Sequence, residues 1–373
     1  MPRVSVLLPC RNAAAHLPEA IASLEAQTYA DFEVLAVDDG STDATAALLE
    51  AWAARDGRVR VLRAPPRGLV PALASALDAA AGELIARMDA DDIAEPDRLA
   101  RQVALLDASP DVVACGTRVR YFPRAAVRDG VRRYEQWLNA LTEPEELARD
   151  IFVECPIAHP ALVVRRAALL AVGGYRDPGW PEDYDLVLRL WAAGGRLANV
   201  PAVLLRWRER PDRTSRTDPR YAADAFRRCK VHHLRRTLLR APPAAGAAGG
   251  DVAGPEAVAA CPEAAAAGQE APAPGSEGAP ARPAVVWGAG PVGKRFAREL
   301  ICQGVPLAAF VDLDPRKIGQ QVYGVPVVAP AEIGRFRGAL ALAAVGSPGA
   351  RQEIRAALDD AGWREGVDYV AVA

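Results

Sequence analysis

The chain of 373 residues has no long apolar run, no closely paired cysteines and no excess of charge of either sign. Its most apolar stretch, residues 158–174, is interrupted by Arg165 and Arg166. No segment therefore reaches the ~20 apolar residues that a membrane-spanning helix needs. The first residues enter a strand pattern at Val4 without the basic and apolar regions of a signal peptide. We expect a protein that stays in the cytoplasm.

The other absences narrow the function classes. The six cysteines are scattered without a CxxC motif, which disfavours a zinc site and predicts reduced thiols. Lys and Arg number 45 against 47 Asp and Glu, for a formal net charge of -2, so composition predicts no nucleic acid partner. With 51% apolar and 25% charged residues, the composition is that of globular domains, and the length suggests two of them.

Apolar strand patterns alternate with helical patterns through the first 115 residues. The expected strands cover residues 4–8, 33–37, 59–63, 84–88 and 112–115. Unbroken apolar strands of this kind predict an α/β fold, with a mostly parallel sheet covered by helices on both faces. The pattern weakens from Thr117 to Arg133, which we predict to be an edge ribbon and a loop.

Acidic side chains come directly after two of these strands. They are Asp38 and Asp39 after the second strand, and Asp89, Asp91 and Asp92 after the fourth. Ligands bind at the carboxyl ends of the strands in such sheets, so one ligand could touch both clusters. Three carboxylates within four residues repel one another and are most easily tolerated around a cation. The pattern predicts a site for a metal and a diphosphate, although a solvated acidic loop could have the same residues.

Six motifs stand in a fixed order along the first 186 residues. They are VSVLLPCRN at residues 4–12, VDDGSTD at 37–43, AGELIARMDADD at 81–92, His159-Pro160, Gly173-Gly174-Tyr175 and EDYDL at 182–186. Together they resemble the family-two, inverting members of the A-type (GT-A) nucleotide-sugar glycosyltransferases. The resemblance covers about residues 2–215 and implies the Rossmann-like GT-A fold with its DXD motif.

On the donor side, the resemblance implies a role for each matching residue. Asp39 would accept a hydrogen bond from the uracil or an equivalent base, with Pro9 and Arg11 lining the same pocket. Asp89 would contact the ribose, and Asp91 would hold Mn²⁺ or Mg²⁺.

On the acceptor side, Asp183 of the Glu182-Asp183 pair would be the general base, and His159 is a candidate for the acceptor site. The chemistry independently favours a carboxylate there, because a sugar hydroxyl is a poor nucleophile at neutral pH. Structural explanations stand beside these roles. Carboxylates in a first helical turn suit the helix dipole, and His159 could be a buried, hydrogen-bonded histidine.

The resemblance implies transfer of a sugar from a nucleotide-diphosphate sugar, with UDP favoured, to a hydroxyl of a glycan or lipid-linked acceptor. The setting would be the synthesis of a cell-surface polysaccharide or glycoconjugate. Two alternatives remain open: a non-catalytic nucleotide-sugar sensor, and an NAD(P)-linked activity in the carboxyl-terminal part of the chain.

An arginine-rich segment, residues 206–240, carries eleven Arg and one Lys against four acids. A solvated helical face is the plain interpretation. The segment could instead supply arginines to a diphosphate, or make a peripheral contact with anionic headgroups at the inner membrane surface.

The composition predicts a first domain over residues 1–240 and a second over 283–373. Between them, 31 of the 42 residues at 241–282 are Ala, Pro or Gly, which predicts a disordered linker. In the second domain a glycine-rich turn follows a strand and opens a helix, and an acid ends the next strand. This arrangement predicts a small Rossmann-like unit that binds a dinucleotide or a nucleotide sugar through Gly288, Gly290, Gly293 and Asp312.

Overall fold

The computed structural model describes residues 1–240, 282–347 and 349–373, and these form two compact units. The first comprises residues 1–151 and 155–222, and the second comprises residues 152–154 together with the described residues from 223 onward. The sequence-based domain boundary at residue 240 lies beyond helix α10 (Ala223–Arg236), which belongs to the second unit. Except for Arg282, the expected linker lies outside the described residues.

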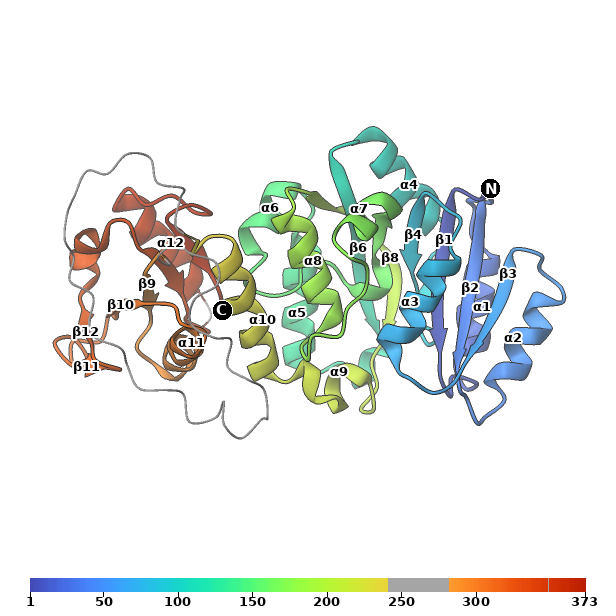
Figure 1. Cartoon of the computed structure of the whole chain (residues 1–373), viewed down its shortest axis with the longest axis horizontal. Coiled ribbons are helices and arrows are strands. Elements are labelled where there is room, and N and C mark those ends of the chain that lie inside the picture. The colour runs from blue at the N-terminus through green and yellow to red at the C-terminus, as the bar shows by residue number, and fades with distance from the viewer. Residues whose placement is uncertain (241–281, 348) are drawn as a thin grey trace. The chain divides into compact units, whose positions relative to one another are not determined.

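The first unit is built on a mixed sheet of eight strands in the order β3-β2-β1-β4-β7-β6-β8-β5. Figure 1 shows β3, β2, β1 and β4 side by side in this order. Strands β1 to β4 pair in parallel, whereas β7 runs antiparallel to both β4 and β6. This α/β architecture confirms the fold class expected from the alternation of strands and helices. The strands are β1 (Val4–Cys10), β2 (Phe32–Asp39), β3 (Val59–Ala64), β4 (Leu84–Arg87), β5 (Ile93–Ala94), β6 (Val112–Phe122), β7 (Val163–Arg165) and β8 (Arg196–Arg208).

Helices connect these strands and cover the sheet. The α-helices of the first unit are α1 (Leu17–Glu25), α2 (Thr45–Ala53), α3 (Leu69–Ala79), α4 (Arg98–Ala108), α5 (Asp129–Ala140), α6 (Pro144–Asp150), α7 (Arg166–Ala171), α8 (Glu182–Ala192) and α9 (Thr214–Thr217). Short 3₁₀ turns lie at η1 (Arg124–Ala126), η2 (His159–Ala161) and η3 (Pro219–Tyr221).

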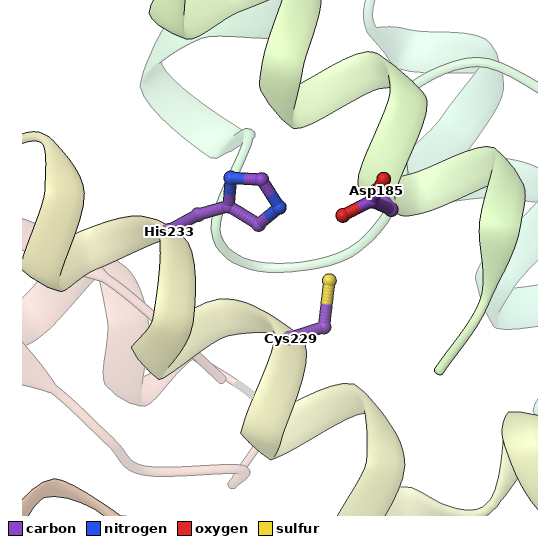
Figure 2. Close-up of side chains that lie close together, drawn as sticks. All are labelled: Asp185, Cys229 and His233. Atoms are coloured by element: carbon purple, nitrogen blue, oxygen red, sulfur yellow. The ribbon is translucent and has the colours of Figure 1, made fainter. Parts of the chain in front are cut away.

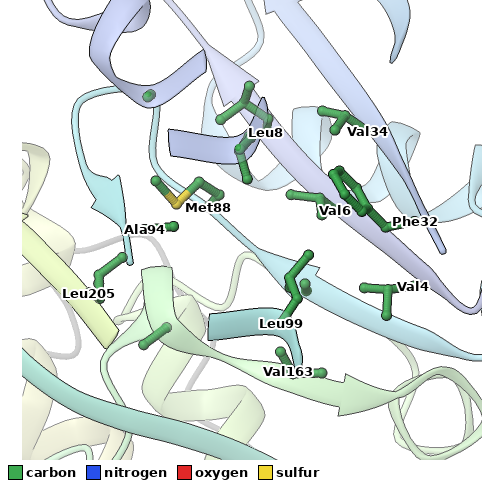
Figure 3. Close-up of a cluster of buried hydrophobic side chains, with 14 of the residues drawn as sticks. Val4, Val6, Leu8, Phe32, Val34, Met88, Ala94, Leu99, Val163 and Leu205 are labelled. Carbon is green, nitrogen blue, oxygen red and sulfur yellow. The ribbon is translucent and has the colours of Figure 1, made fainter. Parts of the chain in front are cut away.

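The central strand β1 is buried on both faces, as its continuous apolar sequence requires. Val4, Val6 and Leu8 alternate along the strand and belong to one apolar cluster, which includes Phe32 and Leu99 (Figure 3). The opposite face of β1 and β2 packs against α3. Helices on both faces leave the strand ends as the place where polar side chains can reach a ligand.

The segment from Thr117 to Arg133 differs from its prediction. Residues up to Phe122 belong to β6, which lies between β7 and β8 inside the sheet, and residues from Asp129 onward start α5. The arginine that broke the apolar pattern, Arg118, donates to the carbonyl oxygens of Asn139 and Pro201. Its charge is therefore accommodated beside an interior strand, so the prediction of an edge ribbon was wrong.

The second unit contains a six-stranded sheet in the order β11-β12-β10-β9-β13-β14, parallel except for the β11–β12 pair. Its strands are β9 (Ala284–Trp287), β10 (Leu307–Val311), β11 (Gln321–Val322), β12 (Val325–Val328), β13 (Leu340–Ala343) and β14 (Tyr369–Ala371). Its helices are α10, α11 (Pro291–Cys302), α12 (Ala350–Asp360) and the 3₁₀ segment η4 (Pro330–Phe336).

The expectations about membrane-spanning segments and about reduced cysteines can be compared with the described residues. None of their helices combines the length and the apolar character that crossing a bilayer requires. Cys10, Cys115, Cys155 and Cys229 are buried thiols outside any disulfide bond. Cys302 is disulfide-bonded, so the expectation of reduced thiols is wrong for that residue.

Candidate functional site

A cavity of about 400 Å³ opens in the first unit at the carboxyl ends of its parallel strands. Its walls come from the ends of β1, β2 and β4, from η2, from the start of α8 and from residues 207–221. Cavities of this size commonly hold a small-molecule ligand. The cavity is lined by all eight first-domain residues proposed from the resemblance as site residues: Pro9, Arg11, Asp39, Asp89, Asp91, His159, Glu182 and Asp183. Asp38 and Asp92, the other acids of the two clusters, are not part of its lining.

Asp39 ends β2, and its buried carboxylate is already anchored to the loop before α3. Its two oxygens accept hydrogen bonds from the backbone N–H groups of Arg67 at 2.8 Å and Gly68 at 2.9 Å. The exposed Arg11 guanidinium lies 3.5 Å from the same carboxylate. These contacts hold the loop against the strand end and leave a cationic side chain at the cavity mouth.

The three acids after β4 form a cluster in which a different group holds each carboxylate. Asp89 Oδ1 lies 2.6 Å from Arg87 Nη1, and Asp91 Oδ2 lies 3.1 Å from Arg210 Nη2. Asp92 Oδ1 accepts a 2.7 Å hydrogen bond from the backbone N–H of Arg208. Burial, followed by the charge of Asp89, raises the pKa of Asp91, and the same causes together with Asp91 raise the pKa of Asp92 strongly.

These acids fit a divalent cation. One carboxylate oxygen from each lies within 4.8 Å of the others, and carboxylate oxygens are the ligands that Mg²⁺ and Mn²⁺ prefer. Asp92 Oδ2 is buried without a hydrogen-bond partner among the described residues. A cation at this point would offset the mutual repulsion that, after burial, raises both pKa values.

Glu182 is fully buried at the first position of α8, although it was predicted as part of a catalytic pair. The hydroxyl of Tyr221 lies 2.7 Å from both of its carboxylate oxygens. Burial raises the pKa of Glu182, and the Tyr221 hydrogen bond opposes that shift. This burial suits a carboxylate that holds its neighbours in place.

His159 lies beside Glu182 in the wall of the cavity. Its Nδ1 is 3.6 Å from Glu182 Oε1, and its buried Nε2 meets no hydrogen-bond partner within the described part of the chain. Burial and the nearby Arg87 charge hold the pKa of His159 well below the usual histidine range. The side chain is therefore a neutral imidazole at physiological pH.

Asp183 is half-buried, unlike Glu182, and also lines the cavity. Its Oδ1 accepts a 2.7 Å hydrogen bond from the backbone N–H of Tyr184, in the first turn of α8. The backbone thus fixes the direction of this carboxylate. Of the two adjacent acids, Asp183 is the more exposed.

Arginines of the 206–240 segment also reach the cavity, where Arg210, Arg213 and Arg220 form part of the wall. The Arg213 guanidinium lies over the Trp207 ring at 4.7 Å and pairs with Glu209. Such fixed cationic side chains suit the oxygens of a diphosphate. Sequence reasoning had named this segment without choosing among its arginines.

A Tyr221→Phe variant should destabilise the first unit, because it removes the hydroxyl that faces the buried Glu182 carboxylate. We expect a loss of about 1–3 kcal/mol in the free energy of unfolding. The change raises the pKa of Glu182 in the folded state further above its unfolded value, so the loss should grow as pH rises. Urea denaturation at mildly acidic and mildly alkaline pH measures it, with Tyr29→Phe as the control. An equal loss at both pH values would contradict the assignment.

The predicted residues of the second unit gather at the ends of β9 and β10. A Cβ atom on Gly293 would lie 1.7 Å from the carbonyl oxygen of Gly288, so close packing of α11 on β9 requires glycine there. Gly290 is the N-cap residue of α11. Asp312 accepts from the backbone N–H groups of Ala289 and Asp314, and Lys317 Nζ lies 3.0 Å away. These contacts give the glycines and Asp312 a structural role in the turn.

Helix α10 carries Cys229 and His233 one turn apart on one face, as Figure 2 shows. Asp185, drawn in the same figure, belongs to the first unit, where its carboxylate accepts from Trp180 Nε1 at 3.1 Å and Arg189 Nε at 2.7 Å. Asp185 and the two α10 side chains therefore belong to different units.

The family model described as "Glycosyl transferase family 2" matches residues 5–172. The putative glycosyltransferase EpsE of Bacillus subtilis is 32% identical over 228 residues, which cover 60% of this chain and 79% of EpsE. The chain belongs to glycosyl transferase family 2. The match to the family model includes the acids after β2 and β4 and ends before Glu182 and Asp183.

A second relative is also a glycosyltransferase, and a solved structure has a similar fold. The amylovoran biosynthesis glycosyltransferase AmsE of Erwinia amylovora is 30% identical over 198 residues, covering 53% of this chain and 72% of AmsE. The structure of S. aureus TarS 1–349 in complex with UDP-GlcNAc has a TM-score of 0.53 at 20% identity. It covers 64% of this chain and 68% of the TarS chain. At that identity the likeness concerns the GT-A fold alone.

Proposed function

We propose that this family 2 glycosyltransferase is a metal-dependent, inverting enzyme that acts in the cytoplasm. It would transfer a sugar from a nucleotide-diphosphate sugar, with UDP favoured, to a hydroxyl of a glycan or lipid-linked acceptor. One observation carries the proposal. A single cavity combines strand-end carboxylates, arginines and the Asp183 carboxylate at a helix start.

In the donor half, Asp39, Pro9 and Arg11 would hold the base, and Asp89 would accept from the ribose hydroxyls. Asp91 would hold Mn²⁺ or Mg²⁺, with Asp89 and Asp92 close enough to share the ion. The bound ion would neutralise the charge that develops on the leaving diphosphate. Arg210 and Arg213 offer further positive charge at the same wall.

In the acceptor half, Asp183 would accept the proton of the acceptor hydroxyl while the oxygen of that hydroxyl forms a bond to the anomeric carbon. The bond from that carbon to the diphosphate breaks on the opposite face, so the anomeric configuration inverts. His159 would receive a second polar group of the acceptor through Nε2, which lacks a partner among the described residues.

The relatives guide the choice of substrate. AmsE is named for the biosynthesis of amylovoran, which favours a role in polysaccharide or glycoconjugate synthesis. TarS was solved with UDP-GlcNAc, so UDP sugars are the first donors to test. The rival interpretation, a sensor that binds without transfer, is disfavoured because Asp91 and Asp183 both line the cavity.

For the second unit we propose a small Rossmann-like module that binds a nucleotide or nucleotide sugar near Gly288, Gly290 and Gly293. The parallel strand order β12-β10-β9-β13-β14 supports this choice. Asp312 supports this proposal less than the glycines do. Its carboxylate already accepts hydrogen bonds from the backbone N–H groups of Ala289 and Asp314 and pairs with Lys317. An NAD(P)-linked activity would need a catalytic set that the sequence of this unit does not offer.

The headgroup contact suggested for residues 206–240 stays a prediction. Several of these arginines pair with carboxylates of their own unit, as Arg210 does with Asp91 and Arg220 with Asp218. Paired guanidinium groups attract an anionic surface less than free ones, so the ion pairs weigh against this contact.

Thermal unfolding of the full chain with UDP, GDP and dTDP sugars, each with Mn²⁺ or with a chelator, tests the proposal. At least one nucleotide sugar should raise the midpoint only when the metal is present. At a ligand concentration one hundred times Kd, the stabilisation should be about 2.7 kcal/mol. If no nucleotide sugar shifts the midpoint in either condition, the proposed function is wrong.

A further inference from the structure

Arg87 is the last residue of β4, directly before the acidic cluster, and the roles assigned above leave it out. Its side chain is only 2% exposed, and it lines the cavity. A buried guanidinium in an otherwise apolar strand is costly, because desolvating a cation costs several kcal/mol unless a partner compensates. The groups that surround Arg87 must therefore compensate the cost of burying its charge.

Asp89 is the partner of Arg87 at the cavity wall, with Nη1 2.6 Å from Asp89 Oδ1. Burial disfavours the charged guanidinium, but Asp89, and to a smaller degree Tyr175 and Glu182, keep the pKa of Arg87 above its ordinary value. Two of its nitrogen atoms, Nε and Nη1, have no aligned hydrogen-bond acceptor among the described residues. The Asp89 contact is thus a close ion pair.

The backbone of Arg87 is fixed on both sides. Its N–H donates to the carbonyl oxygen of Leu162 at 2.8 Å, and its carbonyl oxygen accepts from Arg98 Nη2 at 2.6 Å. The guanidinium therefore extends from a rigid strand end toward a carboxylate that is 31% exposed. This geometry restrains the Asp89 side chain, which sits among like charges that would otherwise push it away.

We propose that Arg87 is a positioning residue for binding of the nucleotide donor. It holds the Asp89 carboxylate in the direction that meets the ligand. The inference rests on the proposed function, since it gives Asp89 a donor contact. It adds that the donor affinity of this cavity depends on a cation buried beneath the acidic cluster. Arg87 would act through Asp89 and would itself remain behind the carboxylate.

The competing explanation places the effect of Arg87 on the acceptor half. The charge of Glu182 also interacts with the guanidinium, and the guanidinium in turn helps to lower the pKa of His159. In that case Arg87 would support Glu182, and its removal would leave nucleotide binding unchanged. A double-mutant cycle separates the two, because residues that act through one contact are not additive.

The cycle uses the full chain and the binding of UDP with Mn²⁺, measured by titration calorimetry, with GDP and dTDP as replacement probes. Asp89→Asn and Arg87→Gln should each weaken binding about tenfold, in line with the loss of one charge-assisted hydrogen bond between the ribose and Asp89. The double variant should also lose about tenfold. Arg87→Lys keeps the charge and should recover part of the affinity.

Arg165→Gln is the matched control, because Arg165 is also a strand arginine but, among the described residues, it donates to the carbonyl oxygens of Leu106, Ser109 and Val112. Its Kd should match that of the unmodified chain. Circular dichroism checks folding. If Arg87→Gln does not fold, the same cycle is run with Arg87→Lys. The loss of nucleotide affinity that Arg87→Lys causes should vanish in the Asp89→Asn background.

Two results would overturn the inference: an Arg87→Gln variant with unchanged Kd, or a double variant weakened about a hundredfold, as independent contacts require. Unmodified protein that binds none of the three nucleotides with Mn²⁺ would instead remove the proposed function itself.

Discussion

An Asp183→Asn variant should release nucleotide from its sugar donor about 10³-fold more slowly than the unmodified chain, whether water or a sugar is the acceptor. The amide keeps the shape of the side chain and its hydrogen bond from the Tyr184 N–H, but it cannot accept the proton of the attacking hydroxyl. Donor affinity should stay within a few-fold of the original, because the proposed donor contacts lie on other elements. Steady-state hydrolysis of the nucleotide sugar, together with calorimetric titration, measures both quantities.

The matched control is Asp129→Asn, which replaces an exposed acid that also lies in the first turn of a helix, α5. If Asp183 only favoured the start of α8 through the helix dipole, both variants would cost a similar few tenths of a kcal/mol in stability and leave the rate intact. A normal rate for Asp183→Asn would exclude this residue as the base.

An Asp91→Asn variant should lose the metal-dependent part of nucleotide binding. The substitution removes one of three carboxylates whose oxygens lie within 4.8 Å of one another, and a neutral amide holds a divalent cation poorly. We expect Mn²⁺ to improve the Kd for the nucleoside diphosphate by about a hundredfold in the unmodified chain and by less than threefold in the variant. Titrations with Mn²⁺, with Mg²⁺ and with a chelator measure the difference.

Asp97→Asn provides the control, since Asp97 lies a few residues beyond the cluster and outside the cavity wall. It should keep the full metal response. Undiminished stimulation by Mn²⁺ in Asp91→Asn would mean that the ion is held elsewhere, and the metal assignment would fall. Asp92 would then be the next residue to examine, because its buried Oδ2 has no partner among the described residues.

Much of the first unit could be predicted from the sequence, because its strands are continuous apolar segments that end abruptly in polar residues. Asp39, Asp89 and Asp91 were located through their place after such strands, since parallel strands bring their carboxyl ends to one edge. The prediction failed at β6, where Arg118 and Arg120 interrupt the apolar pattern. Local pattern cannot reveal that distant carbonyl oxygens, such as those of Asn139 and Pro201, accommodate such a charge.

The roles within the acidic pair at residues 182 and 183 also depended on tertiary structure. Both acids stand at the start of α8 and look alike in sequence, yet one is fully buried and the other half-buried. The buried Glu182 accepts a hydrogen bond from the hydroxyl of Tyr221, which is 39 residues away. The sequence around residues 182 and 183 does not predict a contact with a residue so far along the chain.

By itself, the amino-acid sequence determined most strands of the first unit and the acids that follow them, since strand patterning and side-chain chemistry are local properties of the chain. Only the tertiary structure decided which charges are buried and what each one meets. Arg87 shows the distinction, because in sequence it is one cation in an apolar strand. Its burial at 2% exposure and its 2.6 Å distance from Asp89 arise from the packing around β4, and those two quantities give it a role at the site.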